Sequence, residues 1–206
     1  MKLHIPLLSS SGSKAVNADC SRTHKFQQAT VFRRWSLTYQ QILCIIAGLL
    51  PLAVILLLSA AGDVVLFGEF ISKLGVGQHA LVFNSTLMFA PLLAIPFVFH
   101  VYKRYNYLIV LFIAAVLSLV GVGLFPSTSE FHKPLAALFF LLAFATMLVS
   151  STRMTRRWSR RTTFTLGILG FVGTAFFNPF TETLLVFAVG LWVAGVGLFS
   201  SRLYEK

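Results

Sequence analysis

Charged residues are scarce in this chain of 206 residues, since Asp, Glu, Lys and Arg together make up only 11% of it. Soluble domains carry about 25% charged residues, and a domain of this size cannot hide a large excess of apolar side chains. Apolar residues account for 57% of the chain, and the mean hydropathy is +0.82. The shortage of charge excludes an ordinary soluble domain and predicts a membrane protein.

Cysteine is also scarce. Only Cys20 and Cys44 are present, the first in a polar N-terminal segment and the second inside an apolar block. We expect no disulfide between them, and the absence of CxxC spacing gives no indication of a metal or redox centre. Histidine pairs with HxxxH or HExxH spacing are missing as well, so we predict no metal and no other cofactor.

Charge is missing in particular from the middle of every long apolar block. Ionisable groups at mid-bilayer usually mark ion paths or proton relays, so their absence argues against a pump or a proton-coupled transporter. The net charge of +11 comes from basic residues that punctuate the apolar blocks without forming a stripe with interleaved aromatics. We therefore expect no nucleic acid partner.

The apolar blocks are mostly of about 18–25 residues, the length that a helix needs to cross about 30 Å of hydrocarbon. They predict an all-α fold, a polytopic membrane protein built as a six-transmembrane-helix bundle. The predicted spans are about 42–61, 80–101, 107–124, 135–151, 163–177 and 183–200, within a transmembrane domain of residues 36–202. Residues 1–35 are predicted to be a partly disordered cytoplasmic tail, and residues 203–206 a short C-terminal tail.

Local composition refines this picture in three places. Pro51 lies inside the first span, where it removes a backbone donor and favours a kink, and Pro91 and Pro96 lie inside the second span. Residues 70–85 (FISKLGVGQHALVFNS) concentrate polar and turn-forming residues. Residues 64–78 (VVLFGEFISKLGVGQ) are too interrupted by glycine and charge to span the bilayer, so a short interfacial helix and a turn are expected there. The strongly basic run 153–161 (RMTRRWSRR) is predicted to be a loop.

The basic residues predict the orientation of the bundle. Six lie in the N-terminal tail, two in residues 103–106, five in 153–161 and two near the C-terminus, which places 15 of the 17 on one side of the six spans. By the positive-inside rule this side is cytoplasmic. We predict a multi-pass protein of the cell membrane with both termini in the cytoplasm.

Small residues recur at helical spacing in the last two spans. Gly167, Gly170 and Gly173 lie in the fifth span, and Gly190 and Gly197 lie in the sixth. Such stripes let helix backbones approach closely where no hydrophobic force drives packing. We expect the fifth and sixth spans to pack against each other, and a homodimer interface is the alternative.

A polar set lies in the predicted outer loops and at the helix ends beside them. Its candidate binding residues are Ser72, Asn84, Ser85, His132 and Glu182. If they converge, His132 acts as a base or ligand, Glu182 orients it, and Asn84 and Ser72 donate hydrogen bonds, so that His132 and Glu182 are the catalytic candidates. The same set is also suited to capping helix ends, whose terminal backbone groups have no partner within the helix.

Three sequence elements, residues 71–93, 120–140 and 181–192, resemble the prokaryotic six-span membrane proteins catalogued as domain of unknown function 998. The matching residues are Ile71, Ser72, Leu74, Gly75, Phe83 and Asn84 in the first element, Gly123, Phe125, Pro126, His132, Phe139 and Phe140 in the second, and Glu182 and Trp192 in the third. The resemblance covers about residues 42–200 and implies a six-span fold, while the family has no established activity.

Two departures from the family pattern concern carboxylates. The family often has Asp where this chain has Lys73, and Glu where it has Ser127. If those carboxylates take part in chemistry, this chain lacks that chemistry or uses Glu69 and Glu130 instead.

Three functional hypotheses follow. The first is a non-catalytic integral membrane protein, a scaffold or accessory subunit of a membrane assembly, with membrane lipids and a membrane-protein partner or further copies of itself as its partners. The second is an outer-leaflet protein that binds or hydrolyses lipid headgroups through His132, Glu182 and Asn84. The third is a small-solute transporter, which only the prolines of the first two spans support. Whether the protein is an enzyme stays open, and the sequence favours no enzymatic activity.

Overall fold

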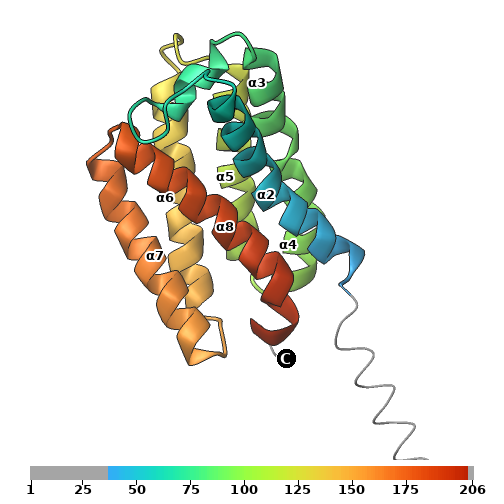
Figure 1. Ribbon diagram of the computed structural model, residues 1–206. Helices are drawn as coiled ribbons and strands as arrows, with labels where there is room; N and C mark the ends of the chain where they lie inside the picture. The colour runs from blue at the N-terminus through green and yellow to red at the C-terminus, as the bar shows by residue number, and fades with distance from the viewer. Residues whose placement is uncertain (1–36, 204–206) are drawn as a thin grey trace, which may run out of the picture. The chain divides into compact units, whose positions relative to one another are not determined.

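The computed structural model describes residues 37–203, with side chains for residues 37–200; the predicted N-terminal tail and residues 204–206 lie outside the described residues. Within this range the chain is all-helical and contains no strand (Figure 1). Its elements are α2 (Tyr39–Ala60), the 3-10 helix η1 (Ile71–Gly75), α3 (Ala80–Phe89), the 3-10 helix η2 (Pro91–Ala94), α4 (Ile95–Tyr102), α5 (Asn106–Leu124), α6 (His132–Ser151), α7 (Arg157–Ala175) and α8 (Pro179–Leu203).

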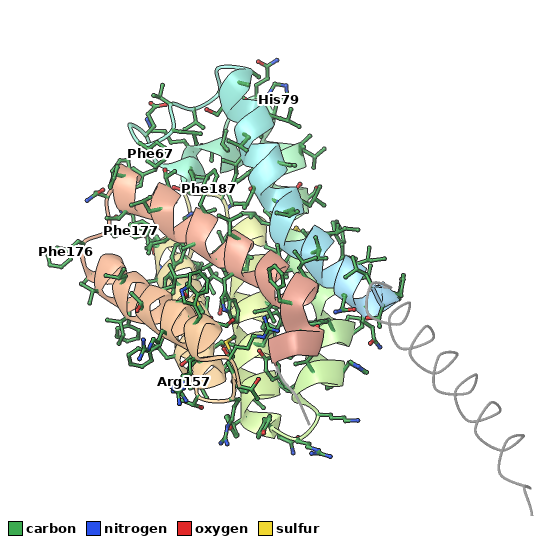
Figure 2. All side chains as sticks on the ribbon, turned by 60° about the horizontal axis from the view of Figure 1, so that its bottom comes forward. Phe67, His79, Arg157, Phe176, Phe177 and Phe187 are labelled. Carbon is green, nitrogen blue, oxygen red and sulfur yellow. The ribbon has the colours of Figure 1, made fainter. Side chains whose placement is uncertain are left out.

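The helices run up and down through one bundle (Figure 1). Because α3, η2 and α4 follow one another along a single pass, the described residues make six passes. We call the end that carries residues 103–105 and 152–161 the basic end. The opposite end carries residues 61–79, 125–131 and 176–178 and is called the loop end. Figure 2 shows Arg157 at the basic end, far from Phe67 and His79 at the loop end.

Five of the passes are long and apolar enough to cross a membrane. They are Tyr39–Ala60, Ala80–Tyr102, Asn106–Leu124, His132–Ser151 and Pro179–Ser200. The described chain is thus an all-helical protein with five membrane-length apolar helices, which indicates a membrane protein. Helix α7 is not among the five because Arg157, Arg160 and Arg161 all lie in its first five residues.

Helix α7 also corrects one predicted boundary. The basic run at residues 153–161 was expected to be a loop, but the helix begins at Arg157 and ends at Ala175, before the predicted end of the span at residue 177. Arginine is a good helix former, so a helix that starts in the apolar segment extends backwards through these residues with little loss. A basic run therefore marks the position of a bundle end better than it marks a loop.

The prolines act differently in the first two passes. Pro51 is accommodated inside α2, which stays helical from Tyr39 to Ala60. The second pass was predicted as one span, but it is interrupted: Pro91 opens η2, and Pro96 lies in the first turn of α4. Proline has no N–H to donate and its ring crowds the preceding turn, so it is best tolerated at the start of a helical segment. The second pass therefore consists of three short helical pieces.

Glycines make the closest helix contacts, but their partners differ from those predicted. Gly167 and Gly170 of α7 lie against side chains of α6, and only Gly173 faces a side chain of α8. Gly190 of α8 lies against Gly48 of α2, where an added Cβ at Gly190 would stand 2.9 Å from the carbonyl oxygen of Gly48. The predicted pairing of the last two passes is thus only a small part of the packing.

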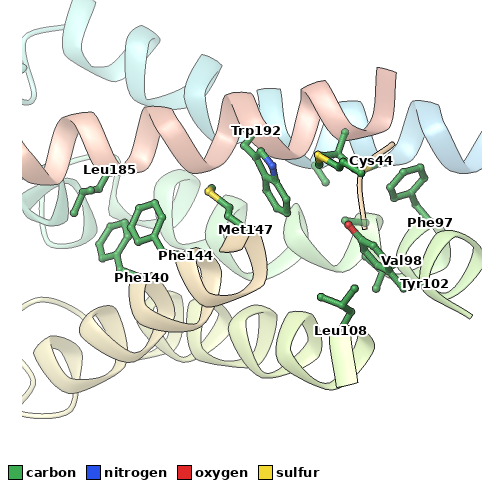
Figure 3. Packing of buried hydrophobic residues seen from close by; sticks show 14 residues of the cluster. Cys44, Phe97, Val98, Tyr102, Leu108, Phe140, Phe144, Met147, Leu185 and Trp192 are labelled. Atoms are coloured by element: carbon green, nitrogen blue, oxygen red, sulfur yellow. The ribbon is translucent and has the colours of Figure 1, made fainter. Parts of the chain in front are cut away.

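Two apolar clusters fill the bundle. The larger includes Phe140, Phe144 and Met147 of α6 together with Leu185 and Trp192 of α8 (Figure 3). The smaller lies towards the loop end and joins η1 to its neighbours through Ile71, Leu74, Phe83, Leu87 and Val122. Burying the two η1 side chains anchors this short helix to α3 and α5 and fixes the surroundings of the candidate residues.

Candidate functional site at the loop end

Helix α8 begins in a way that fixes the position of Glu182. Pro179 is its first residue, and the side-chain oxygen of Asn178 accepts a hydrogen bond of 3.0 Å from the backbone N–H of Thr181. In return, the hydroxyl of Thr181 accepts a hydrogen bond of 2.8 Å from the N–H of Asn178. Asparagine before a proline is a strong helix start, because it satisfies an N–H that has no partner within the helix. Glu182 is thereby held in the first turn, facing the loop end.

The Glu182 carboxylate is buried against the start of η1. The residue is only 6% exposed, and its Oε2 accepts a hydrogen bond of 2.8 Å from the N–H of Ile71. The N–H and the hydroxyl of Ser72 also donate towards this carboxylate. The first N–H groups of a helix have no acceptor within it, so a carboxylate placed here accepts their hydrogen bonds. Its negative charge also interacts favourably with the positive N-terminal end of the helix dipole. Glu182 thus caps η1 from a helix 111 positions further along the chain.

Asn84 holds the other end of the same short helix. Its Nδ2 in α3 donates a hydrogen bond of 3.0 Å to the carbonyl oxygen of Gly75. A Cβ on Gly75 would stand 2.9 Å from the Oδ1 of Asn84, so a larger residue at position 75 would displace the side chain that makes this hydrogen bond. Ser85 follows Asn84 in α3, and its side chain therefore leaves the helix about 100° further round. Of this neighbouring pair, Asn84 is the residue that binds η1.

His132 binds a different loop. It is the first residue of α6, is 6% exposed, and has its Nδ1 2.8 Å from the carbonyl oxygen of Phe125. A carbonyl only accepts, so Nδ1 carries the hydrogen, and in the neutral ring Nε2 is the acceptor. The bond closes residues 125–131, where the rings of Phe125 and Phe131 also pack with their centroids 5.5 Å apart. His132 is thus part of a closed turn.

A contact between His79 and Asp63, ionic when the histidine ring is protonated, closes the long first loop and was not predicted from the sequence. The Nδ1 of His79 lies 2.6 Å from the Oδ2 of Asp63, and these two residues stand at the two ends of residues 63–79. Two further features shape this loop: Gly62 adopts a φ of 90° directly after α2, and Phe67 at φ 65° packs on Phe180 of α8 with ring centroids 5.5 Å apart. The sequence pattern that could have predicted this contact is an acidic residue, Asp63, and a histidine, His79, at the two ends of a glycine-containing loop.

A second ion pair lies on the surface of the same loop. The Nζ of Lys73 donates a hydrogen bond of 2.7 Å to the Oε1 of Glu69, and the N–H of Val65 donates one of 3.2 Å to Oε2. These two hydrogen bonds and the nearby positive charge hold the pKa of Glu69 below its usual value of 4.5. The pair is exposed, so it stabilises the loop only weakly.

The structure brings together some of the five candidate residues but not all of them. Glu182 and Ser72 meet, and Asn84 binds the far end of the helix that begins with this contact. His132 binds Phe125 of another loop. Among residues 37–200, no group of three or more His, Cys, Asp or Glu side chains that could hold a metal ion is found. Glu182, Ser72 and Asn84 therefore hold η1 in place. His132 holds the turn before α6.

A cavity of about 110 Å³ lies deeper in the bundle, away from the loop end. It is lined by residues of α2, α3, η2, α5, α6 and α8, and its lining is almost wholly apolar, with Phe112, Ala143 and Thr146 among the lining residues. None of the five candidate residues lines it. Trp192 also lines it, and its Nε1 is buried with no hydrogen-bond partner among the described residues. The cavity could not be predicted from the sequence, because residues of six separate helical segments line it jointly.

Comparison of the chain with protein-family models, with curated proteins and with solved structures found no match. The resemblance to the family catalogued as domain of unknown function 998 therefore stays a prediction.

Proposed function

We propose that this is a six-span, non-catalytic protein of the cell membrane that serves as a scaffold or accessory subunit of a membrane assembly. One observation carries the proposal: the polar side chains of the loop end bind backbone groups of their own loops. Glu182 accepts from Ile71, Asn84 donates to Gly75, and the histidine of α6 donates to its own preceding turn. Side chains engaged in this way stiffen an end of the bundle for contact with a partner.

The proposed sixth span is α7. The apolar part of this helix, residues 162–175, is about 21 Å long at 1.5 Å per residue, whereas the whole helix of 19 residues is about 28 Å long. Arginine side chains can extend along the helix so that their charges reach the headgroup level, which lets such a helix cross. Support comes from its position, because α7 packs beside α6 and α8 and ends at the loop end (Figure 1).

The proposed orientation places the basic end in the cytoplasm. All described cations except Lys73 and Lys133 belong to that end, while Asp63, Glu69, Glu130 and Glu182 belong to the loop end. The positive-inside rule then puts both termini in the cytoplasm.

Thiol labelling in intact cells tests this topology. On a background with Cys20→Ser and Cys44→Ala, single cysteines are introduced at Thr128, Thr152 or Phe176, and a membrane-impermeant maleimide is added. We expect labelling at positions 128 and 176 only, with position 152 labelled after permeabilisation. If position 176 is protected like position 152, α7 does not cross the membrane and the six-span proposal is wrong.

Extraction in a mild detergent at native abundance tests the role as a subunit. We expect the protein to elute well above the size of its own micelle, together with a stoichiometric membrane-protein partner or further copies of itself. A protein that always elutes as a single chain would contradict the proposal.

The two other hypotheses have less support. A headgroup hydrolase needs His132 and Glu182 on one substrate, whereas each binds a different loop and neither lines the cavity in the bundle. A transporter needs a polar path, whereas that cavity is apolar.

A further inference from the structure

The basic end carries a dense group of exposed cations. Its members are Lys103, Arg104, Arg153, Arg156, Arg157, Arg160 and Arg161. They come from two turns that touch each other: the guanidinium of Arg153 lies 4.7 Å from the ring centroid of Tyr105, and its Nε donates a hydrogen bond of 2.9 Å to the hydroxyl of Tyr107. The α4–α5 turn and the α6–α7 turn therefore present one continuous basic surface.

This surface has no acidic counterpart in the described part of the chain. Neither of the two ion pairs found there belongs to the basic end, since one joins Lys73 to Glu69 and the other His79 to Asp63. Like charges held together at short range repel one another, and this repulsion persists until anions bind. The arrangement therefore favours an anionic partner that supplies several negative charges.

Exposed aromatic side chains stand among the cations. Trp158 is 80% exposed between Arg157 and Arg160, and Tyr107 is 43% exposed beside Arg153. An amphipathic ring next to cations is typical of the membrane interface, where the ring lies at the level of the headgroups and carbonyls. The partner that fits offers phosphate and apolar surface side by side.

We propose that the basic end is a binding site for anionic phospholipid headgroups, with the arginines of residues 153–161 as the main phosphate ligands. The proposal relies on the six-span topology, which places the first turn of α7 at the headgroup level. Six of the seven cations are arginine, whose planar fork holds a phosphate through two parallel hydrogen bonds. A bound lipid would also neutralise the charges that shorten the apolar part of α7.

Lipid retention by the purified full-length protein tests the proposal. The protein in a neutral detergent is titrated with phosphatidylglycerol or with phosphatidylcholine, and bound lipid is counted by native mass spectrometry. The test variant is R160Q/R161Q, and the matched control is K73Q/K133Q, which removes the same charge from the loop end. At about fivefold per arginine, the dissociation constant for phosphatidylglycerol should rise about 30-fold in the test variant. In the control it should stay within a factor of about two.

Other results would overturn the proposal. These are equal weakening in both variants, equal binding of phosphatidylcholine, displacement of the lipid by millimolar inorganic phosphate, or tighter binding of a short RNA than of the lipid. R160K/R161K keeps the charge and should retain more affinity than R160Q/R161Q, which separates charge loss from misfolding. If R160Q/R161Q does not fold, K103Q/R104Q is measured in its place, with the same direction expected.

The lipid titration and the thiol labelling fail independently. The titration is made on detergent-solubilised protein and reports lipid binding whichever side of the membrane the basic end occupies. The labelling reports the topology whether or not a lipid is bound.

Discussion

The contact of α2 with α8 yields the sharpest prediction, because it brings two backbones together. A Cβ added at Gly48 would stand 2.7 Å from the backbone nitrogen of Ala194 and closer still to the carbonyl oxygen of Gly190. To restore an ordinary contact of 3.4 Å with both of these backbone atoms, the helices must separate by about 1 Å. No side chain can rotate away to relieve this clash, so the whole crossing shifts.

We expect Gly48→Ala to lower the free energy of unfolding by about 2 kcal/mol, the middle of the range for overpacked cores. For a chain of this length that corresponds to a fall in melting temperature of about 4–8 °C. The measurement is thermal unfolding of the full-length protein in a mild detergent, followed by intrinsic fluorescence. Gly195→Ala is the matched control, since nothing lies within 4 Å of a Cβ there.

The control also accounts for helix propensity. Replacing glycine by alanine inside a helix stabilises it by up to about 1 kcal/mol, so Gly195→Ala should melt at the same or a slightly higher temperature. If Gly48→Ala melts together with Gly195→Ala, the close backbone contact is not present and the reasoning about this crossing is wrong.

Three further predictions concern the loop end and the cavity. Glu182→Ala leaves the N–H of Ile71 without its acceptor, so we expect a loss of about 1–3 kcal/mol and faster hydrogen exchange at residues 71–75, and unchanged exchange there would contradict the capping role. Ala143→Val places two more carbons towards the apolar cavity and should raise the melting temperature by a few degrees, whereas a fall would mean that the cavity is not empty space. Lys73→Gln removes the group that stabilises the charged form of Glu69, so its pKa should rise towards 4.5 in a carbon-13 NMR titration; the small stabilisation that the pair gives is present at neutral pH and lost as the pH falls through the lowered pKa.

The sequence predicted the passes well because each depends on a local property. Apolar length alone placed the first pass at about residues 42–61, close to the observed Tyr39–Ala60, and the second at about 80–101, without the break that the structure has at Pro91. Helix α7 is the instructive exception, since its arginines are good helix formers and poor membrane residues, so its helical bounds and its apolar bounds differ. The composition therefore predicted the apolar part of α7 but not the start of the helix at Arg157.

The candidate site was less predictable because it depends on which distant residues meet. The polar types at the loop end were identified, but nothing in the sequence shows that Glu182 reaches Ile71 while His132 binds the turn before its own helix. The glycine stripes show the same limit: the spacing predicted close packing, while the partners of Gly48 and Gly170 depend on the three-dimensional order of the passes. The cavity beside Trp192 could not be predicted, because no single segment of the sequence contains more than a part of its lining.

The bond between Glu182 and Ile71 also constrains the order in which the bundle can be completed. The loop after α2 is synthesised well before its carboxylate partner, which belongs to α8, the last helix that the structure describes. The tight crossing of α2 with α8 has the same property, because its two halves are the first and last described passes. Until α8 arrives, the start of η1 and one face of α2 are left without their partners. A chain shortened before Pro179 is therefore expected to be recognised by membrane quality control as unfinished.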